Sequence, residues 1–493
     1  MKEKKFLAID FGAESGRAIV GILKNNKISL VEVHRFPNKP VNVLGSLNWN
    51  ILDLFDELKN GILKAVQNGH DDIKSIAVDT WGVDFGLLSK DDHLIGFPFA
   101  YRDARTNGML EKAFKLMPKN EIYDYTGIQF MQINSAFQLL SMKLKKDTQL
   151  KAADKLLFMP DLFNFLLTGK KKSEYTISST SQLLNAKNRN WEERIFNELK
   201  IPKKIMCDIV YPGTKIGNLH ESICEFAGIN NIDVVAVGSH DTASAVAAVP
   251  NLGENSAFIS SGTWSLIGIE SDKPIINDKS FKYNFTNEGG VFGKIRFLRN
   301  VMGMWIIQRL KKEWEIEGQL YSYSELNEMA KNAKPFICFI DVDNSDFLNP
   351  LNMTETILTY CKKTNQNKPQ NKAEFIRAVL ESLAIKYRII LENISEISQK
   401  KINLLNIVGG GSQNELLNQF TSDCTGLRVI AGPVEATAFG NILVQAIASN
   451  DIKDIESGRK IISRSVELKK YKPMNRKNWD NAYLNVKKII NNY

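Results

Sequence analysis

The sequence predicts an α/β protein of two domains. Short apolar runs with strand character alternate with helical patterns, and two strand–turn–strand units stand about half a chain apart. The chain has 493 residues, which is longer than a single domain usually reaches, and hydrophobic residues make up 43% of it. We therefore expect a first domain over residues 1–247, a second over 248–450 and a tail of unassigned role over 451–493.

The first predicted element is a β-meander. Phe6–Asp10 has the character of a buried strand, a glycine-containing turn follows, and Arg17–Leu23 resumes an apolar strand. Asn25 and Asn26 then predict a hairpin turn into a third strand, Lys27–Phe36.

A helix and a further strand come next. From Ile51 onward, apolar residues recur at helical spacing as far as Val66, behind Asn50 as the expected N-cap. Ile73–Val78 then returns to strand character. This alternation of strand and helix indicates α/β architecture.

The second half of the chain opens in the same way as the first. Ala257–Ser261 is expected to be a strand, Gly262 and Thr263 a turn, and Trp264–Ile269 a second strand. Duplication of one domain is a natural explanation for this similarity, with the boundary between about Val246 and Glu254.

A long amphipathic helix is predicted over Ala373–Ile397, where apolar residues follow the 3.6-residue period. A strand, Leu404–Val408, follows it and leads into Gly409–Gly411. We expect the next helix to start near Gln413.

Charge and hydropathy exclude several classes of protein. The formal net charge is +9, but the basic residues form short scattered clusters without interleaved aromatic residues, so we expect no nucleic acid partner. No stretch approaches the roughly 18 apolar residues that span a bilayer. The apolar run Phe6–Ile9 is too short for an export signal, because Asp10 ends it. The sequence thus predicts a cytoplasmic protein that is not in a membrane.

The cysteines are expected to be buried, reduced thiols. They lie far apart in the sequence, without a CxxC pair or a histidine at metal-ligand spacing, and no HExxH occurs. This pattern disfavours a zinc enzyme. The five residues are Cys207, Cys224, Cys338, Cys361 and Cys424.

Three glycine-containing turns follow predicted strands and together indicate a phosphate cradle. They are Asp10–Arg17, Ser260–Thr263 and Gly409–Asn414. Glycine lets backbone N–H groups approach an anion closely, although each turn alone could be only a turn. No GxxxxGK[ST] motif occurs, and no strand leads into GxGxxG. P-loop and Rossmann sites are therefore disfavoured.

Carboxylates at strand ends are the second chemical feature. Asp10 and Asp79 end predicted strands, and Asp241 lies just beyond another. Ligands bind at the carboxyl ends of strands in open α/β sheets, where a carboxylate can hold Mg²⁺ through water or accept a proton from a hydroxyl group. Each could instead be a helix cap or turn acceptor, and Asp241 above all, because an alanine-rich helix follows it.

Some neighbouring side chains suit the binding of a polyol. The His240 side chain can form a hydrogen bond with a sugar hydroxyl, and the ring faces of Trp81 and Trp264 can lie against C–H bonds of the sugar. The segment Asp79–Asp84 combines such groups in six residues. The alternative is that these are packed core side chains.

Seven segments carry a resemblance to a known family. They are Asp79–Gly86, Tyr101–Gly108, Ser239–Pro250, Ile259–Ser265, Thr286–Gly290, Phe297–Gly303 and Val408–Asn414. Together they resemble the FGGY family of carbohydrate kinases, and among its members those that act on L-rhamnulose. The resemblance covers roughly Phe6–Ile447.

This resemblance implies two actin-like (ribonuclease H-like) ATPase domains that face a central cleft. It also implies an enzyme that uses ATP as co-substrate and Mg²⁺ as cofactor to phosphorylate a small ketose, L-rhamnulose, at C1. Asp241 would be the general base, and Asp10 would hold Mg²⁺ through water. A monomer or a small homo-oligomer is expected.

The resemblance also assigns binding residues. Those assigned to ATP are Ala13, Glu14, Ser15, Gly16, Arg17, Thr263, Gln308, Gly409, Gly410 and Gly411. Those assigned to the sugar are Gly82, His240, Asp241, Thr242 and Asn300.

One residue departs from the family pattern. Glu14 stands where serine or threonine is usual beside the phosphates, and a carboxylate there would repel phosphate unless it turned outward or reached the metal. Two other functions remain open. One is a kinase for L-fuculose or another ketose, and the other is an actin-like ATP-binding switch without kinase activity.

Overall fold

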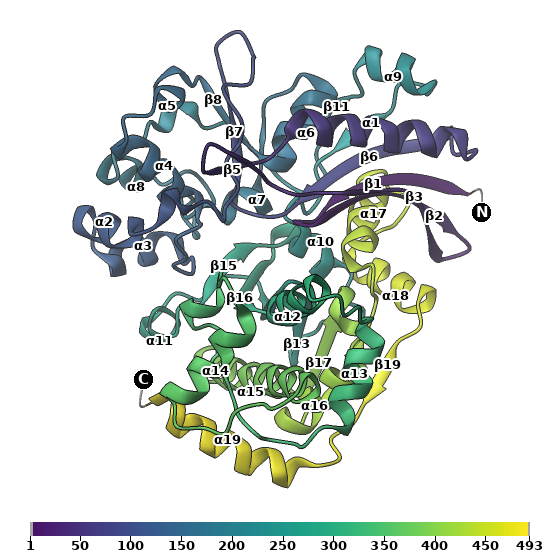
Figure 1. Ribbon diagram of the computed structural model, residues 1–493. Coiled ribbons are helices and arrows are strands. Elements are labelled where there is room, and N and C mark those ends of the chain that lie inside the picture. Colours follow the sequence, from purple (N-terminus) through teal and green to yellow (C-terminus); the bar gives the residue numbers. More distant parts are fainter. Residues whose placement is uncertain (1–2, 492–493) are drawn as a thin grey trace. The chain divides into compact units, whose positions relative to one another are not determined.

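The computed structural model of the chain describes residues 3–491 (Figure 1). It is a mixed α/β structure. Its strands are β1 (Lys4–Phe11), β2 (Ser15–Lys24), β3 (Lys27–Pro37), β4 (Val41–Val43), β5 (Ser46–Asn48), β6 (Ile73–Thr80), β7 (Phe85–Leu88), β8 (Lys155–Phe158), β9 (Ser173–Glu174), β10 (Ile209–Val210), β11 (Lys215–Asn218), β12 (Asp233–Val235), β13 (Ser256–Ser261), β14 (Trp264–Ser271), β15 (Thr286–Gly289), β16 (Ile295–Met302), β17 (Leu404–Val408), β18 (Arg428–Ala431) and β19 (Lys469–Tyr471).

Helices connect and cover these strands. They are α1 (Ile51–Gln67), α2 (Met109–Leu116), α3 (Lys119–Thr126), α4 (Ser135–Leu144), α5 (Thr148–Ala152), α6 (Met159–Thr168), α7 (Tyr175–Ser179), α8 (Glu193–Glu198), α9 (Glu221–Ala227), α10 (Asp241–Ala247), α11 (Asp278–Lys282), α12 (Trp305–Ile316), α13 (Tyr323–Asn332), α14 (Met353–Lys363), α15 (Lys372–Ser398), α16 (Glu415–Thr425), α17 (Ala436–Ala448), α18 (Ile455–Ser465) and α19 (Arg476–Asn491).

The chain divides into two compact units, each built from separated segments. Unit 1 comprises Met1–Pro250, Glu270–Phe297 and Ala436–Val466. Unit 2 comprises Asn251–Ile269, Leu298–Glu435 and Glu467–Tyr493. The tail therefore contributes to both units, α18 to unit 1 and β19 with α19 to unit 2.

The first sheet has the strand order β11-β12-β6-β1-β2-β3. β1 pairs antiparallel with β2, and β2 pairs antiparallel with β3, which confirms the predicted meander. Asn25 and Asn26 both have positive φ angles at its hairpin, as a tight turn between twisted strands requires. On its other edge β1 runs parallel to β6, which runs parallel to β12.

The two faces of the first sheet have different roles. Leu7, Ile9 and Phe11 alternate along β1 and share a hydrophobic core with α1. Figure 1 shows α1 along one side of this sheet and α17 along the other. Asp10 lies between Ile9 and Phe11 in β1, so the strand alternation turns its side chain away from α1. Asn50 occupies the N-cap position of α1, as predicted, but its side chain makes no capping hydrogen bond.

The second sheet repeats the order of the first and adds one strand, β15, at its edge. Its strands run β15-β16-β14-β13-β17-β18-β19. β13 pairs antiparallel with β14 and parallel with β17, as β1 does with β2 and β6. β18 and β19 then correspond to β12 and β11, because each pair is antiparallel and ends its sheet. This shared topology supports the duplication that the sequence suggests.

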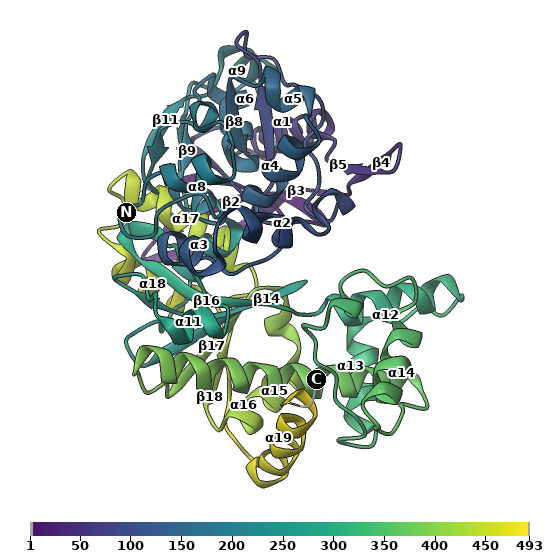
Figure 2. The same cartoon turned by 90° about the vertical axis from the view of Figure 1, so that its left-hand side faces the viewer.

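The helices of unit 2 agree closely with the sequence pattern. The predicted helix over 373–397 is α15, which extends by one residue at each end. Figure 2 shows α15 and α16 side by side, and they make extensive contact. The helix expected near Gln413 begins later, at Glu415, because a 3₁₀ turn over Gly410–Gln413 comes first. The Asn414 side chain caps α16 by accepting a hydrogen bond from the Leu417 backbone N–H.

Two expectations from composition can be compared with the structure. Within residues 3–491, no helix has both the length and the apolar character that a membrane span would require. Four of the cysteines are buried, and Cys224 is partly buried.

Asp84 joins four segments of unit 1. Its Oδ2 accepts hydrogen bonds from the indole N–H groups of Trp49, at 2.7 Å, and Trp81, at 3.0 Å, and from the Tyr101 backbone N–H. Its Oδ1 accepts from Nε2 of Gln138. Burial raises the pKa of Asp84 to about 6, against the effect of these donors. Trp81 is therefore a core aromatic residue that helps to hold Asp84.

The substitution Asp84→Asn should destabilise unit 1. The N–H₂ group of asparagine would face an N–H group that now donates to the Asp84 carboxylate. Two donors would then oppose each other, so the free energy of unfolding should fall by about 1–3 kcal/mol. Denaturant unfolding followed by tryptophan fluorescence measures this loss, because Trp49 and Trp81 both contact Asp84. Asp91→Asn in the exposed turn directly after β7 is the matched control and should change little. Equal midpoints for the two variants would contradict the prediction.

Candidate functional site

Asp10 and Asp79 lie side by side at the ends of two parallel strands. They are register partners of β1 and β6, and both are buried. Arg17 on β2 donates from Nη2 to Oδ2 of Asp10 at 2.7 Å. Burial, followed by the neighbouring Asp10 carboxylate, raises the pKa of Asp79 well above its usual range. The strand ends thus bring together two of the carboxylates that the sequence singles out.

A chain of buried amide and hydroxyl groups holds Asp79. Asn441 on α17 donates from Nδ2 to Oδ2 of Asp79 at 2.6 Å. Gln445, one turn further along α17, donates to Oδ1 of Asn441 and to the Leu7 backbone oxygen. Ser75 on β6 donates in turn to Oε1 of Gln445. The chain fixes Asp79 from the helix on the other side of the sheet.

Asp241 is the first residue of α10, and its side chain is about one-third exposed, at 32%. It accepts hydrogen bonds at Oδ1 from the backbone N–H and the hydroxyl of Thr242. His240 occupies the N-cap position, so Asp241 does not act as the cap. Its carboxylate is accessible, whereas Asp10 and Asp79 are not.

The position of α10 is set by α17. A Cβ atom on Gly440 of α17 would lie 1.7 Å from the Ser244 backbone oxygen of α10. The two helices can approach this closely only because residue 440 has no side chain. This contact fixes the helix that carries Asp241.

Arg459 binds the other end of α10. From α18 in the tail, it donates to the backbone oxygens of Ala247, at 3.2 Å, and Val246, at 3.1 Å. Its guanidinium group also pairs with Glu270 at 2.9 Å. The last carbonyl groups of a helix lack hydrogen-bond donors within the helix, and here a buried arginine supplies those donors. The tail therefore has a structural role that the sequence did not reveal.

His240 lies beside Asp241 and close to Gly82. The distance from His240 Nε2 to Asp241 Oδ1 is 3.4 Å. A Cβ atom on Gly82 would lie 3.3 Å from the same Nε2, so glycine leaves this nitrogen open. The His240 backbone N–H donates to the Thr176 hydroxyl on α7. Unit 1 therefore brings together the predicted sugar-binding residues Gly82, His240, Asp241 and Thr242.

The first glycine turn leads from β1 into β2. The Gly12 N–H donates to the Ser15 oxygen at 2.9 Å, and Asn38 Nδ2 donates to the Gly12 oxygen at 2.7 Å. Phe36 covers Gly16 so closely that a Cβ atom there would lie 2.2 Å from its ring. The turn carries the predicted ATP residues Ala13, Glu14, Ser15, Gly16 and Arg17. The Glu14 side chain is exposed to solvent.

The other two glycine turns lie together in unit 2. A Cβ atom on Gly409 would lie 2.9 Å from the Ser261 oxygen, and one on Gly411 would lie 2.1 Å from the Ser261 hydroxyl. The Thr263 oxygen accepts from the N–H groups of Gly303 and Trp305, which ties the β13–β14 turn to the start of α12.

The remaining predicted ATP residues of unit 2 surround these contacts. Gln308 lies on the first turn of α12, and its Oε1 is buried without a hydrogen-bond donor among residues 3–491. Gly410, between the two packed glycines, meets no atom within 4 Å of the Cβ position, which leaves open space beside the backbone.

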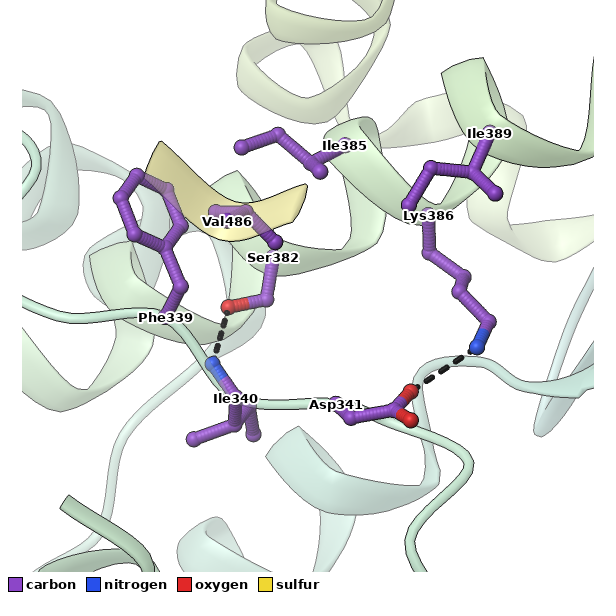
Figure 3. Close-up of a pocket in the computed structure, with 8 residues that line it drawn as sticks. All are labelled: Phe339, Ile340, Asp341, Ser382, Ile385, Lys386, Ile389 and Val486. Carbon is purple, nitrogen blue, oxygen red and sulfur yellow. Dashed lines mark hydrogen bonds and ion pairs between the residues drawn. The ribbon is translucent and has the colours of Figure 1, made fainter. Parts of the chain in front are cut away.

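Asn300 lies on β16 beside a network of ion pairs. Its neighbour Arg299 pairs with Asp343 at 3.2 Å, and Lys386 of α15 pairs with both Asp343 and Asp341. Figure 3 shows Lys386 pointing to Asp341 across a small pocket that is otherwise lined mainly by apolar side chains. Because this lysine is paired, the pocket is a packing gap between α15, α19 and residues 339–341, not a second ligand site.

The carboxylates suit Mg²⁺, which prefers oxygen ligands. Residues 3–491 contain no group of three or more acidic, histidine or cysteine side chains that could enclose a metal. Mg²⁺ does not need such a cage, because it usually keeps several waters and binds one or two carboxylates together with phosphates. Asp10 and Asp79 place two buried carboxyl groups side by side at the ends of β1 and β6, which fits an ion held through water.

The sequence did not reveal the partners that hold the site. Asn441, Arg459, Glu288 and Arg296 come from segments far from Asp79, Asp241 and His240 in the chain. A signal was available for two of them. Asn441 and Gln445 are polar residues four apart in a mainly apolar helix, and Arg296 is a charged residue between the apolar residues Ile295 and Phe297.

Known families match both halves of the chain. The N-terminal domain of the FGGY family of carbohydrate kinases matches residues 5–248, and its C-terminal domain matches residues 257–449. Curated proteins named rhamnulokinase are similar over nearly the whole chain. That of Bacteroides thetaiotaomicron is 44% identical over 99% of this chain and 100% of its own, and that of Oceanobacillus iheyensis is 43% identical over 94% and 97%.

Solved structures agree in fold. A ligand-bound xylulose kinase from Lactobacillus acidophilus has a TM-score of 0.81 at 17% identity, over 99% of this chain and 98% of its own. A Plasmodium falciparum glycerol kinase with ADP has a TM-score of 0.77 at 14% identity, over 98% of each chain. These neighbours have the actin-like, ribonuclease H-like fold predicted from the sequence.

Gly440→Ala should disturb the packing of α10. The added methyl group overlaps the Ser244 oxygen, so one helix must move, and we expect the free energy of unfolding to fall by about 1–3 kcal/mol or more. Gly253→Ala is the control, because its methyl group would meet no atom within 4 Å. Denaturant unfolding of both variants measures the difference. A Gly440→Ala protein as stable as the control would show that the helices can separate without cost.

Proposed function

Because the chain belongs to the FGGY family of carbohydrate kinases, we propose that it transfers the γ-phosphoryl group of ATP to the C1 hydroxyl of L-rhamnulose. The observation that carries this proposal is Asp241, an accessible carboxylate on a firmly held helix beside His240 and the open position at Gly82. The relatives named rhamnulokinase support this choice of sugar.

Asp241 would act as the general base. In the proposed step the C1 hydroxyl oxygen bonds to the γ-phosphorus, the bond from that phosphorus to the bridging oxygen breaks, and ADP leaves with the electron pair. The hydroxyl proton passes to Oδ1 or Oδ2 of Asp241. The base has little covalent work in such a transfer, so positioning and charge neutralisation supply most of the acceleration.

ATP would be bound by the three glycine turns together with Thr263 and Gln308. Backbone N–H groups would contact the phosphates at the turns, and Arg17 would contribute positive charge. Asp10 would hold Mg²⁺ through water, with Asp79 beside it. When bound, this ion would neutralise charge on the phosphates. The exposed Glu14 side chain can point to solvent, so its repulsion of phosphate would be small.

The division of labour between domains is part of the same proposal. We assign most of the sugar contacts to residues 1–247, and we divide the ATP contacts equally between residues 13–17 and residues 248–450. Asn300, in the last of these ranges, would add a contact to the sugar. Closure around both substrates would exclude water and suppress hydrolysis of ATP.

Asp241→Asn should bind ATP normally but lose most of the transfer. The change removes the base and leaves the side-chain volume almost unchanged, and general-base catalysis contributes about 10²–10⁴-fold. Turnover is measured by ADP release with saturating ketose, and ATP binding by calorimetry. Asp91→Asn again serves as the surface control. Unchanged turnover in Asp241→Asn would remove this residue from the proposed mechanism.

A panel of sugars tests the proposed function itself. ADP release with Mg²⁺-ATP is compared for L-rhamnulose, L-fuculose, L-xylulose, D-xylulose and glycerol. We expect kcat/KM to be highest for L-rhamnulose. Preference for another ketose would keep the enzyme class and change the substrate, whereas sugar-independent hydrolysis, or none with any sugar, would favour an ATP-binding switch.

A further inference from the structure

A buried group of charged side chains surrounds the ring of His240. Arg296 on β16 is fully buried, and its Nη2 lies 3.1 Å from His240 Nδ1, within hydrogen-bond distance. The same Nη2 lies 3.2 Å from Oε2 of Glu288 on β15. Nε of Arg296 donates to the Gly289 backbone oxygen at 2.8 Å, which orients the guanidinium plane.

This contact determines which nitrogen of His240 carries the proton. Arginine has five N–H donors and no acceptor, so Nδ1 must accept the hydrogen bond from Arg296. A neutral imidazole has one N–H, which must then be on Nε2. The ring is thus held as the tautomer that carries its hydrogen on Nε2, the nitrogen that points away from Arg296.

Glu288 also lies near Nδ1, and its carboxylate would favour the opposite tautomer. Its Oε2 lies 3.4 Å from Nδ1, which is farther than the arginine nitrogen. Glu288 already forms an ion pair with Arg296, so the guanidinium group largely compensates the charge of the Glu288 carboxylate. Glu288 therefore helps to fix Arg296, and Arg296 fixes the ring.

The backbone of His240 is held as firmly as its ring. The Thr176 hydroxyl accepts from the His240 N–H at 3.2 Å and donates to Oε2 of Glu174 at 2.6 Å. The neighbouring Ser239 oxygen accepts from the Thr80 N–H at the end of β6. These contacts leave Nε2 facing Asp241 Oδ1 and the position left open at Gly82.

We propose that Arg296 and Glu288 are positioning residues that hold His240 as the Nε2–H tautomer, and that this N–H donates to the oxygen on C2 of the ketose. The second half rests on the proposed function. Asp241 takes the proton of the C1 hydroxyl, so the adjacent donor on His240 meets the adjacent oxygen of the sugar. In an open-chain ketose this oxygen is a carbonyl, which can only accept.

The tautomer can be measured without any substrate. The chain has five histidines, so ¹³C,¹⁵N-histidine labelling gives few ring signals, and His240→Gln assigns the one of interest. We expect the ring ¹⁵N and ¹³Cδ2 shifts of a neutral imidazole protonated at Nε2. A ring protonated at Nδ1, or at both nitrogens, at the pH of the activity assay would overturn the proposal.

A double variant tests the cause of this tautomer. Arg296→Met alone would leave Glu288 buried without its arginine, so it is combined with Glu288→Gln to remove both charges. In the folded double variant we expect the His240 signals to show a mixture of tautomers. The ring of the exposed His220, which contacts Ser222 at 2.8 Å, is the internal control and should not change. Unchanged His240 signals would show that Arg296 does not set the tautomer.

A pair of substrate analogues tests the contact with C2. The alditol of the substrate keeps an oxygen on C2, and its 2-deoxy form lacks that oxygen alone. For the wild-type enzyme, we expect kcat/KM to be about 10–100-fold lower for the 2-deoxy form than for the alditol. Loss of this hydrogen bond would leave the buried His240 N–H without an acceptor. In the double variant, the ratio of kcat/KM for the alditol to kcat/KM for its 2-deoxy form should fall below about 3. KM for ATP should stay within about 2-fold of the wild-type value. A ratio that is the same in both enzymes would contradict the contact.

The two measurements separate this inference from the proposed function. An Nε2–H ring in a protein that phosphorylates no ketose would refute the proposed function and the sugar contact, and would retain the role of Arg296. Ketose phosphorylation with a ring protonated at Nδ1 would refute the inference and retain the function.

Discussion

The contact between α10 and α17 is the constraint on which the candidate site depends. At Gly440 the helix α17 lies against the backbone of α10, and at the next residue Asn441 binds Asp79. Helix α17 thus fixes the position of Asp241 and the orientation of the Asp79 carboxylate, which lies beside Asp10. Packed helices have low compressibility, so a shift at this contact would pass to both acidic groups. The precision of the site comes from this backbone contact more than from any single polar bond.

Several buried polar groups in unit 1 have partners that fix their direction. Asp84 receives two indole N–H groups, Glu174 receives the Thr176 hydroxyl, and Arg296 lies between His240 and Glu288. Hydrogen bonds are stronger in a low-dielectric interior, and unpaired groups there are costly. Such networks therefore favour one arrangement of donors over all others. For a sugar, whose recognition depends on the placement of similar hydroxyl groups, a fixed donor is more useful than a strong one.

Sequence periodicity and turn chemistry predicted much of the fold. The meander, the Asn25–Asn26 hairpin, the long helix α15 and the repeated strand–turn–strand unit all follow from patterns within a few residues. The positions of Asp10 and Asp79 followed from strand ends. The partners of these residues could not be predicted in the same way, because Asn441 reaches Asp79 across 362 positions of the chain and local patterns contain no information on such distances. The helix after Gly411 was misplaced by two residues, since a 3₁₀ turn satisfies the same glycine-rich pattern.

The segmented composition of unit 1 has a consequence for biosynthesis. Synthesis on the ribosome proceeds from the N-terminus, and domains generally fold as units once their residues have emerged. Unit 1 includes α17 and Arg459, which are made after the first two of the three segments of unit 2. Until then, the face of β1 and β6 that α17 covers and the last carbonyl groups of α10 lack their final partners. The nascent chain must therefore carry an incomplete first unit through most of translation, and a chain released before Arg459 would lack the residue that completes α10.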